Sequence, residues 1–218
     1  MTDPRLIRYY RARACEYEEI YYRDKPARRA ELAAETNRLQ QLVADRSILD
    51  VPCGTGYWLE RMSQTATDIV AVDITLEMIN QARTKKCECP VAFVLSDLYN
   101  LPLADNGFDV VALGFWFSHH PKQAYDVLFD AITPQLKAGG RIWMIDNNPP
   151  AEGSQLRSAG TDKHGNNYTL RHLKNGTEFA ILKNYFDQDQ LQEAFLPRFH
   201  IERLMYGTNY WSVVLKPR

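Results

Sequence analysis

From residue 47 onward, short apolar runs rich in β-branched residues alternate with amphipathic stretches. Such alternation is typical of βαβ units, in which helices connect the strands of a mainly parallel sheet and pack on its faces. We expect helices after the first, second and fourth strands. The pattern therefore predicts an α/β fold with a Rossmann-like, doubly wound sheet. The expected strands are residues 48–51, 69–72, 91–95, 108–114 and 141–145.

Two strand pairs and one helix are expected beyond this alternating region. The first pair flanks Asn175-Gly176, a dipeptide that tolerates the positive φ angles of a tight turn. It predicts a β-hairpin inserted at about residues 165–185. The second pair flanks a turn that begins at Gly207. The expected elements are strands at 168–173 and 179–182, a capped helix at 187–196, and strands at 199–206 and 210–215.

The residues before 47 read as helical. Asp3-Pro4 is typical of a capped helix start with proline in the first turn, and after Pro26 apolar side chains recur at helical spacing. We therefore divide the chain into an N-terminal helical lid, residues 1–46, and a Rossmann-like domain, residues 47–218. Because 218 residues suffice for one full core, both parts are expected to form one structural domain.

The net charge and the length of the apolar runs limit the expected partners and the cellular location of the chain. A formal net charge of −1 gives no general attraction to a polyanion, so neither a nucleic acid nor a membrane is expected as a partner. The chain begins with charged residues and has no apolar run of about 18 residues, so a cytoplasmic location is expected. Cys87 and Cys89 lack a second ligand pair, so no metal site is expected there.

The strongest functional signal is a glycine turn that follows the first expected strand. Gly54 and Gly56 let the backbone adopt positive φ angles and approach a ligand, and the following helix N-terminus adds amide donors. Asp73 ends the second strand, at the offset where such sheets place an acid on ribose hydroxyls, and Asp97 ends the third. The carboxyl ends of parallel strands share one crevice, so these residues and Asp50 are predicted to converge there.

A nicotinamide dinucleotide oxidoreductase is the first alternative for such a crevice. Its glycine motif needs a third glycine, and Leu59 occupies that position. Acids at three strand ends also suit S-adenosylmethionine better than they suit a pyrophosphate group. A second alternative is a regulatory protein that binds the cofactor without catalysis, which the glycine turn alone does not exclude.

These residues resemble the class I S-adenosylmethionine-dependent methyltransferases over nearly the whole chain, residues 9–214. The family's first motif, acid-x-Gly-x-Gly-x-Gly, appears at residues 50–56 with Pro52 in place of the first glycine, which stiffens the turn. Residues 136–140 and the final antiparallel strand pair also match. The resemblance implies a seven-stranded, mainly parallel sheet with an antiparallel last strand. It also implies S-adenosylmethionine as the cofactor, S-adenosylhomocysteine as its product, and methyl transfer to an oxygen or nitrogen atom of a small-molecule metabolite.

The resemblance also implies roles for individual residues. Residues 16–21 resemble the lid of small-molecule methyltransferases, and Tyr17 and Tyr21 lie one helical turn apart on one face. Both are predicted site residues, within a set of lid tyrosines suited to covering a ligand. The other implied roles are contact with the methionine moiety for Gly54 and Gly56, ribose binding for Asp73, packing on adenine for Ile74, and recognition of the adenine edge by Asp97 and Leu98.

The acceptor is expected to meet the methyl group beyond the fourth strand, at residues 115–121. Phe115 and Trp116 are predicted to wall the pocket, where aromatic faces attract a sulfonium cation. Packing in the core is the alternative for both. His119 and His120 are both candidates for the general base, because histidine titrates near neutral pH. His119 is the predicted one, because it resembles a histidine often found at this place in related methyltransferases. The alternative is that it caps the helix that begins near Pro121.

Two basic residues of the inserted hairpin, Arg171 and Lys183, have two interpretations. Insertions near such a crevice shape access to it, so both side chains are candidates for meeting an acidic acceptor. The alternative is that they protect an exposed strand edge from pairing.

Two motifs after the fifth strand resemble sites of other methyltransferases. Residues 148–150 resemble a motif of nucleic-acid amino methyltransferases, but that motif belongs after the fourth strand, and Ala151 lacks its aromatic ring. Asp146 resembles a metal ligand of catechol-type O-methyltransferases, but residues 114–121 lack the partner acid. We therefore expect neither nucleic-acid methylation nor a catalytic metal.

Overall fold

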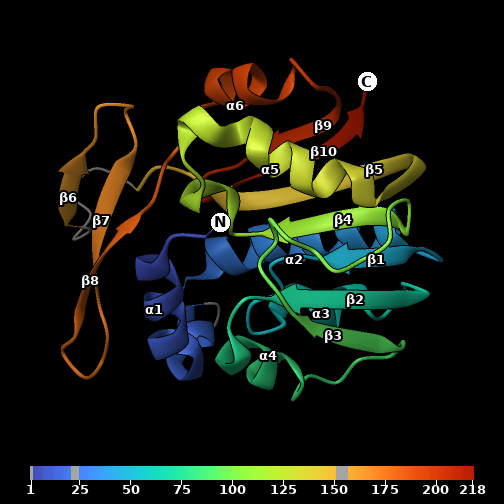
Figure 1. Cartoon of the computed structure of the whole chain (residues 1–218), viewed down its shortest axis with the longest axis horizontal. Coiled ribbons are helices and arrows are strands. Elements are labelled where there is room, and N and C mark those ends of the chain that lie inside the picture. Colours follow the sequence, from blue (N-terminus) through green and yellow to red (C-terminus); the bar gives the residue numbers. More distant parts are fainter. Residues whose placement is uncertain (1, 21–24, 151–156) are drawn as a thin grey trace.

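The computed structural model describes residues 2–20, 25–150 and 157–218, and a seven-stranded sheet forms its centre (Figure 1). Its strands are β1 (Ser47–Asp50), β2 (Asp68–Asp73), β3 (Val91–Leu95), β4 (Phe108–Gly114), β5 (Leu136–Asn147), β9 (Phe199–Tyr206) and β10 (Tyr210–Pro217). They lie in the order β3-β2-β1-β4-β5-β10-β9. Neighbours are parallel from β3 to β5, whereas β10 is antiparallel to both β5 and β9. This topology confirms the predicted Rossmann-like fold with its antiparallel last strand.

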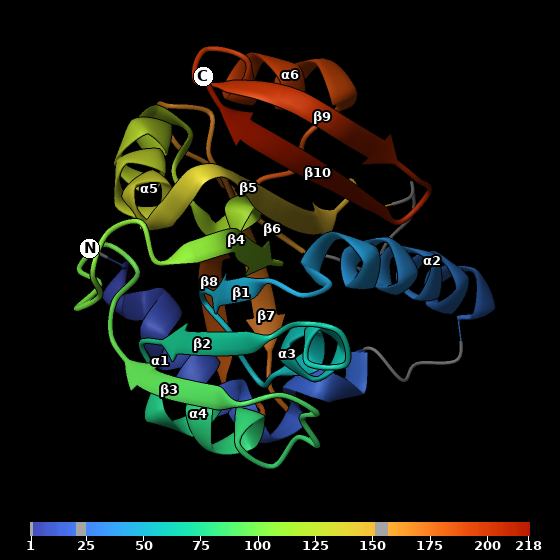
Figure 2. The same ribbon diagram turned by 90° about the vertical axis from the view of Figure 1, so that its right-hand side faces the viewer.

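Helices cover both faces of the sheet (Figures 1 and 2). They are α1 (Pro4–Arg13), α2 (Pro26–Val43), α3 (Tyr57–Met62), α4 (Leu76–Ala82), α5 (Tyr125–Ile132) and α6 (Gln188–Phe195), and a 3₁₀ helix, η1 (Ala14–Ile20), follows α1. Successive strand residues alternate between two cores: Ile48 packs with α2 and α3, and Leu49 packs with α5 and α6. Leu6 and Tyr9 of α1 join the second core. Both sheet faces are buried, which explains the nearly continuous apolar strands in the sequence.

A second, three-stranded sheet in the order β6-β7-β8 stands beside α1 (Figure 1). Its strands are β6 (Ser158–Thr161), β7 (Asn167–His172) and β8 (Glu178–Leu182). β7 and β8 pair around the turn at Asn175-Gly176, where Gly176 has a φ of 84°. The rings of Phe179 in β8 and Tyr9 in α1 lie 5.6 Å apart, centre to centre. β6 was not expected, because its four residues are small or polar and fully exposed.

β5 begins at Leu136, earlier than the expected start at residue 141. Gly139 has a φ of 78°, and a Cβ atom on Gly140 would lie 3.0 Å from Leu136 Cδ2. The register between β4 and β5 shifts in this part of the pair. The two glycines therefore accommodate an irregularity inside the strand rather than marking its start.

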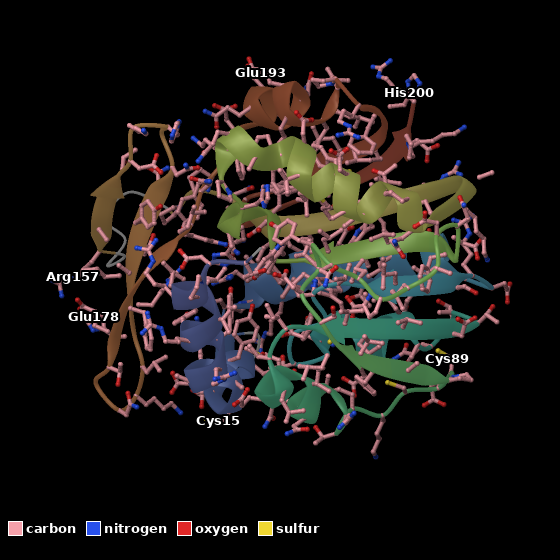
Figure 3. All side chains as sticks on the ribbon, in the orientation of Figure 1. Cys15, Cys89, Arg157, Glu178, Glu193 and His200 are labelled. Atoms are coloured by element: carbon pink, nitrogen blue, oxygen red, sulfur yellow. The ribbon has the colours of Figure 1, made fainter. Side chains whose placement is uncertain are left out.

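Within the described ranges, no helix combines the length and apolar character needed to cross a membrane. All four cysteines are free thiols. Figure 3 shows Cys15 near the lid helices and Cys89 beside β3, well apart from each other.

Candidate functional site

A pocket opens at the carboxyl ends of β1, β2 and β4, where parallel sheets bind their ligands, and α1 forms part of its wall. It holds about 590 Å³ of empty space, its open mouth included. Its lining residues are Thr2, Leu6, Ile7, Tyr10 and Tyr17 from the lid, and Val51, Pro52, Gly54, Val72, Asp73, Ile74, Thr75, Met78, Ser96, Leu98, Gly114, Phe115 and Trp116 from the sheet side.

The pocket brings together most of the predicted cofactor contacts. Three of them, Asp50, Gly56 and Asp97, lie outside its wall, and Tyr21 falls outside the described residues. The predicted base, His119, also lies outside the wall. The predicted contacts within the wall are Tyr17, Gly54, Asp73, Ile74, Leu98 and Phe115.

The glycine turn needs each of its two glycines for a different reason. Gly54 has a φ of 55° and nothing within 4 Å of where a Cβ atom would stand, so it lines open space in the pocket. Gly56 has a φ of 84° and caps α3, and a Cβ atom there would lie 2.9 Å from Lys85 Cγ and 3.1 Å from Ala82 Cβ. Gly54 therefore admits a ligand, whereas Gly56 admits the neighbouring helix. Pro52, in place of the family's first glycine, is part of the pocket wall.

The carboxylate of Asp73 joins the end of β2 to the glycine turn. Its Oδ2 accepts from the Gly54 amide at 3.0 Å, and its Oδ1 accepts from both the amide and the hydroxyl of Thr75 at 2.9 Å. Burial raises the pKa of Asp73, and the hydrogen bonds from Thr75 and Gly54 act against that shift. The side chain thus lines the pocket with an oriented carboxylate, the group that ribose hydroxyls bind in such sheets.

Asp50 is a buried acid beside Asp73. Its Oδ2 has no hydrogen-bond partner among the described residues. Burial, and then the negative charge of Asp73, raise the pKa of Asp50 well above its usual value. The raised pKa favours the neutral acid and so limits repulsion between the two side chains.

Asp97 binds the start of the chain. Its carboxylate accepts from the amide of Thr2 at 3.0 Å and from the Thr2 hydroxyl at 2.8 Å. Thr2 itself is part of the pocket wall, as is Leu98, the neighbour of Asp97. Asp97 therefore holds Thr2 at the pocket rather than lining the pocket itself.

Two hydrogen bonds hold His119 in one tautomer. Its Nδ1 donates to the carbonyl oxygen of Leu182 at 2.6 Å, so its Nε2 accepts from the hydroxyl of Tyr10 at 2.7 Å. Burial, and then the charge of Lys183, lower the pKa of His119 to about 3, which keeps the ring neutral. Burial also raises the pKa of Tyr10 well above its usual value, so the phenol keeps its proton. Tyr10, rather than His119, lines the pocket.

The buried neutral His119 predicts acid-sensitive stability. Its pKa of about 3 in the fold lies below the usual 6.5, so between these values the unfolded chain binds a proton that the folded chain does not. The free energy of unfolding should therefore decrease as the pH is lowered through this range. This group contributes at most about 1.4 kcal/mol per pH unit. Urea denaturation of the wild type and of His119→Gln at pH 7 and pH 5 measures the effect. The wild type should lose more stability than the variant, and equal losses would contradict the prediction.

Lys183 forms a buried ion pair with Asp146 at the end of β5. The side chain of Lys183 is 5% exposed, and its Nζ lies 2.8 Å from Asp146 Oδ1 and 2.6 Å from Ser118 Oγ. Asp146 Oδ2 accepts from the Ser118 amide at 2.9 Å. Lys183 therefore is not a charge that protects a strand edge. The carboxylate considered as a metal ligand is engaged by an ammonium group, and the described residues hold no cluster of three or more potential metal ligands.

The sequence reasoning missed the contribution of α1 and of the adjoining terminus to the pocket. Thr2, Leu6 and Ile7 line it, together with Met78 of α4. The available signal was spacing, because Leu6 and Tyr10 lie four residues apart on one helical face.

Known proteins resemble the part of the chain that contains the strand ends. Residues 48–140 match a family model described as a methyltransferase domain. Over 128 residues the chain is 29% identical to the demethylmenaquinone methyltransferase of Renibacterium salmoninarum, which covers 55% of this chain and 52% of the relative. Over 127 residues it is 32% identical to the biotin biosynthesis bifunctional protein BioHC of Teredinibacter turnerae, which covers 52% of this chain and 21% of that protein. The chain thus spans about half the length of the demethylmenaquinone methyltransferases it matches.

Solved structures share the fold over nearly the full length. The structure described as a DhpI-SAM-HEP complex has a TM-score of 0.77 and 22% identity, with 100% of both chains covered. The 1,6-didemethyltoxoflavin-N1-methyltransferase of Burkholderia thailandensis, bound to S-adenosylhomocysteine, has a TM-score of 0.64 and 16% identity, with 98% of this chain and 87% of that chain covered. At these identities the likeness establishes the fold.

Proposed function

We propose that this chain, a member of the class I S-adenosylmethionine-dependent methyltransferases, transfers a methyl group to an oxygen or nitrogen atom of a small-molecule metabolite. The observation that carries the proposal is one pocket whose wall combines Asp73 and Gly54 at the strand ends with Tyr10 and Trp116. The relatives support a small acceptor, because their names contain demethylmenaquinone and 1,6-didemethyltoxoflavin, which are small molecules.

The pocket residues fit the cofactor. The Asp73 carboxylate accepts hydrogen bonds and lines the pocket, as binding of ribose hydroxyls requires, and the space beside Gly54 is open. Asp50 stays a predicted contact through its Oδ2, which no described residue contacts by a hydrogen bond. The remaining proposed roles are packing on adenine for Ile74 and Leu98, closure for Tyr17, and an aromatic face toward the sulfonium for Phe115.

The acceptor side supplies positioning and a route for a proton. When bound, S-adenosylmethionine supplies an electrophilic methyl group on a positively charged sulfur. The pocket wall would hold the acceptor's lone pair in line with that methyl group, which in-line displacement of the sulfur requires. The acceptor proton passes to the Tyr10 oxygen as the Tyr10 proton moves to Nε2 of His119, which already accepts its hydrogen bond. We therefore propose that His119 acts as the base through Tyr10 and holds the proton only transiently. Its lowered pKa keeps the resting ring neutral and its Nε2 free to accept.

Calorimetry followed by a transfer assay tests this function. We expect S-adenosylhomocysteine to bind and NAD not to bind. Incubation with methyl-labelled S-adenosylmethionine and a metabolite extract should then place the label in a small-molecule product. Binding of NAD without S-adenosylhomocysteine would support an oxidoreductase instead. Cofactor binding with no labelled product in any extract would support a regulator.

His119→Ala is expected to lower kcat by about 100-fold with little change in affinity for S-adenosylhomocysteine, because the base lies outside the pocket wall. Tyr10→Phe should lower kcat similarly, since it keeps the ring and removes the hydroxyl that reaches His119. The double variant should be no slower than either single variant, because both act on one proton. His200→Ala, an exposed histidine at the far edge of the sheet, is the control (Figure 3). If the losses in kcat of the two single variants multiply in the double variant, the two residues act separately.

A further inference from the structure

Three positive side chains, Arg13, Arg171 and Lys183, lie where the lid packs on the inserted hairpin. Arg13 donates to the hydroxyl of Tyr9, whose ring packs on Phe179. Phe179 is in turn the strand partner of Arg171. Arg13 ends α1, Arg171 lies in β7, and Lys183 follows β8. The helix and the hairpin lie side by side (Figure 1), and the ring of Tyr9 in α1 packs against the ring of Phe179 in β8. Three separate segments of the chain thus place a cation in the same region.

This region adjoins the pocket. The Arg13 guanidinium carbon lies 5.1 Å from the ring centre of Tyr17, which lines the pocket. Burial is the largest cause of the lowered pKa of Lys183. Asp146 raises this pKa, whereas the positive charges of Arg171 and Arg13 lower it further. Lys183 therefore lies within the electrostatic reach of both arginines. The cations therefore stand close behind the tyrosine wall of the pocket.

Of these cations, only Lys183 has a carboxylate partner within the described part of the chain, namely Asp146 at 2.8 Å. Arg13 donates to the hydroxyl of Tyr9, which is not a carboxylate. The Nε of Arg171 is buried and has no hydrogen-bond partner among the described residues. The region therefore holds two guanidinium charges that no described acid neutralises.

Two acids of the lid contact another residue, Lys174. Glu16 accepts from the amide of Lys174 at 3.3 Å, and Glu19 pairs with the ammonium group of Lys174. By contrast, Arg203, which is half-buried on the opposite edge of the sheet, does have a carboxylate partner, Glu35, at 3.3 Å. Within the described part of the chain, Arg13 and Arg171 thus lack the kind of acid partner that Arg203 has.

We propose that the acceptor is a small anion whose carboxylate or phosphate-type group binds between Arg13 and Arg171. The inference rests on the proposed methyl transfer, because it identifies the acceptor of the same site. A guanidinium group binds an oxyanion through parallel N–H donors, and a partly buried, unpaired cation gains much from such a partner. Anchoring the charged end of the acceptor also fixes the direction of its nucleophile, which in-line displacement requires.

Titration of inorganic phosphate and of acetate into the full chain loaded with S-adenosylhomocysteine tests this site by calorimetry or NMR. We expect saturable binding of at least one anion, and the preferred one separates a phosphate-type from a carboxylate acceptor. Arg171→Met and Arg13→Met should each weaken that binding by about tenfold or more. Added KCl should weaken it in the wild type.

Arg157→Met is the matched control, because it removes the same charge from the outer side of the same small sheet (Figure 3). The Arg157 side chain is 67% exposed and 3.8 Å from Glu178, and its loss should leave anion affinity unchanged. Should Arg171→Met fail to fold, Arg171→Lys, which keeps the charge but loses the parallel donors, replaces it and should bind more weakly than wild type. A wild type that binds neither anion, or arginine variants that bind as tightly as wild type, would overturn the proposal. A wild type that fails to bind S-adenosylhomocysteine would overturn the proposed function instead.

Discussion

Replacing Asp146 with alanine is expected to lower the free energy of unfolding by about 3–5 kcal/mol, because the substitution leaves a buried ammonium group without its partner. The side chain of Asp146 is fully buried and holds Lys183 at 2.8 Å. It also accepts from the Ser118 amide at 2.9 Å and from the Asn147 amide at 2.7 Å. Urea denaturation at pH 7 measures the loss.

The matched variants separate a lost partner from a lost side chain. Lys183→Met should destabilise comparably, whereas Asp146→Leu combined with Lys183→Met should recover much of the stability, because it removes both charges. Glu193→Ala, on the exposed face of α6, should change stability by less than about 0.5 kcal/mol (Figure 3). A loss below about 1 kcal/mol in Asp146→Ala would show that the pair contributes little.

The same pair adds a low-pH component to stability. Burial is the largest single influence and tends to raise the pKa of Asp146. The charge of Lys183, together with the interactions with His119 and Ser118, outweighs burial and lowers the pKa to about 2. A carboxyl group with a lowered pKa stabilises the fold above its usual pKa of about 3.9 and loses that contribution as the pH falls toward 2. This loss is centred below the range in which His119 acts, which ends at a pKa of about 3.

The second large effect is expected at the cofactor side, where Asp73→Ala should weaken binding of S-adenosylhomocysteine by about 10- to 100-fold. The substitution removes the carboxylate proposed to bind the ribose. It also removes the acceptor for the Gly54 amide at 3.0 Å, so the glycine turn loses a bond that fixes its position. Calorimetry on the folded variant measures the change.

Asp68→Ala is the control for this experiment, because Asp68 stands at the opposite end of the same strand and accepts from the Ser47 hydroxyl at 2.7 Å. It should leave the affinity unchanged. Asp73→Asn should bind with intermediate affinity, because the amide oxygen still accepts but carries no charge. Unchanged affinity in Asp73→Ala would place the ribose elsewhere.

The sequence predicted those features that depend on local pattern. The strands from β1 to β4 follow from apolar, β-branched runs, and the pocket's position follows from parallel strand ends that carry Asp73 and a glycine turn. β6 escaped prediction, because it owes its strand conformation to pairing with β7 rather than to its own residues.

Contacts between distant segments were not predictable from spacing. The bond from Tyr10 to His119 joins residues 109 positions apart, and the bond from Thr2 to Asp97 joins residues 95 positions apart. Both depend on how the lid packs across the strand ends. Periodicity describes only what lies within one element, so the residue types were evident while their partners were not.

The ion pair between the hairpin and the sheet has a consequence for exchanging parts between relatives. Lys183 lies just beyond β8, whereas Asp146 belongs to the central sheet, so the inserted segment is stabilised by a group it does not contain. A hairpin grafted from a protein without this lysine would leave a bare carboxylate in the interior. The inserted hairpin therefore depends on the central sheet for its stability, and any recombined hairpin must be chosen together with the residue at position 146.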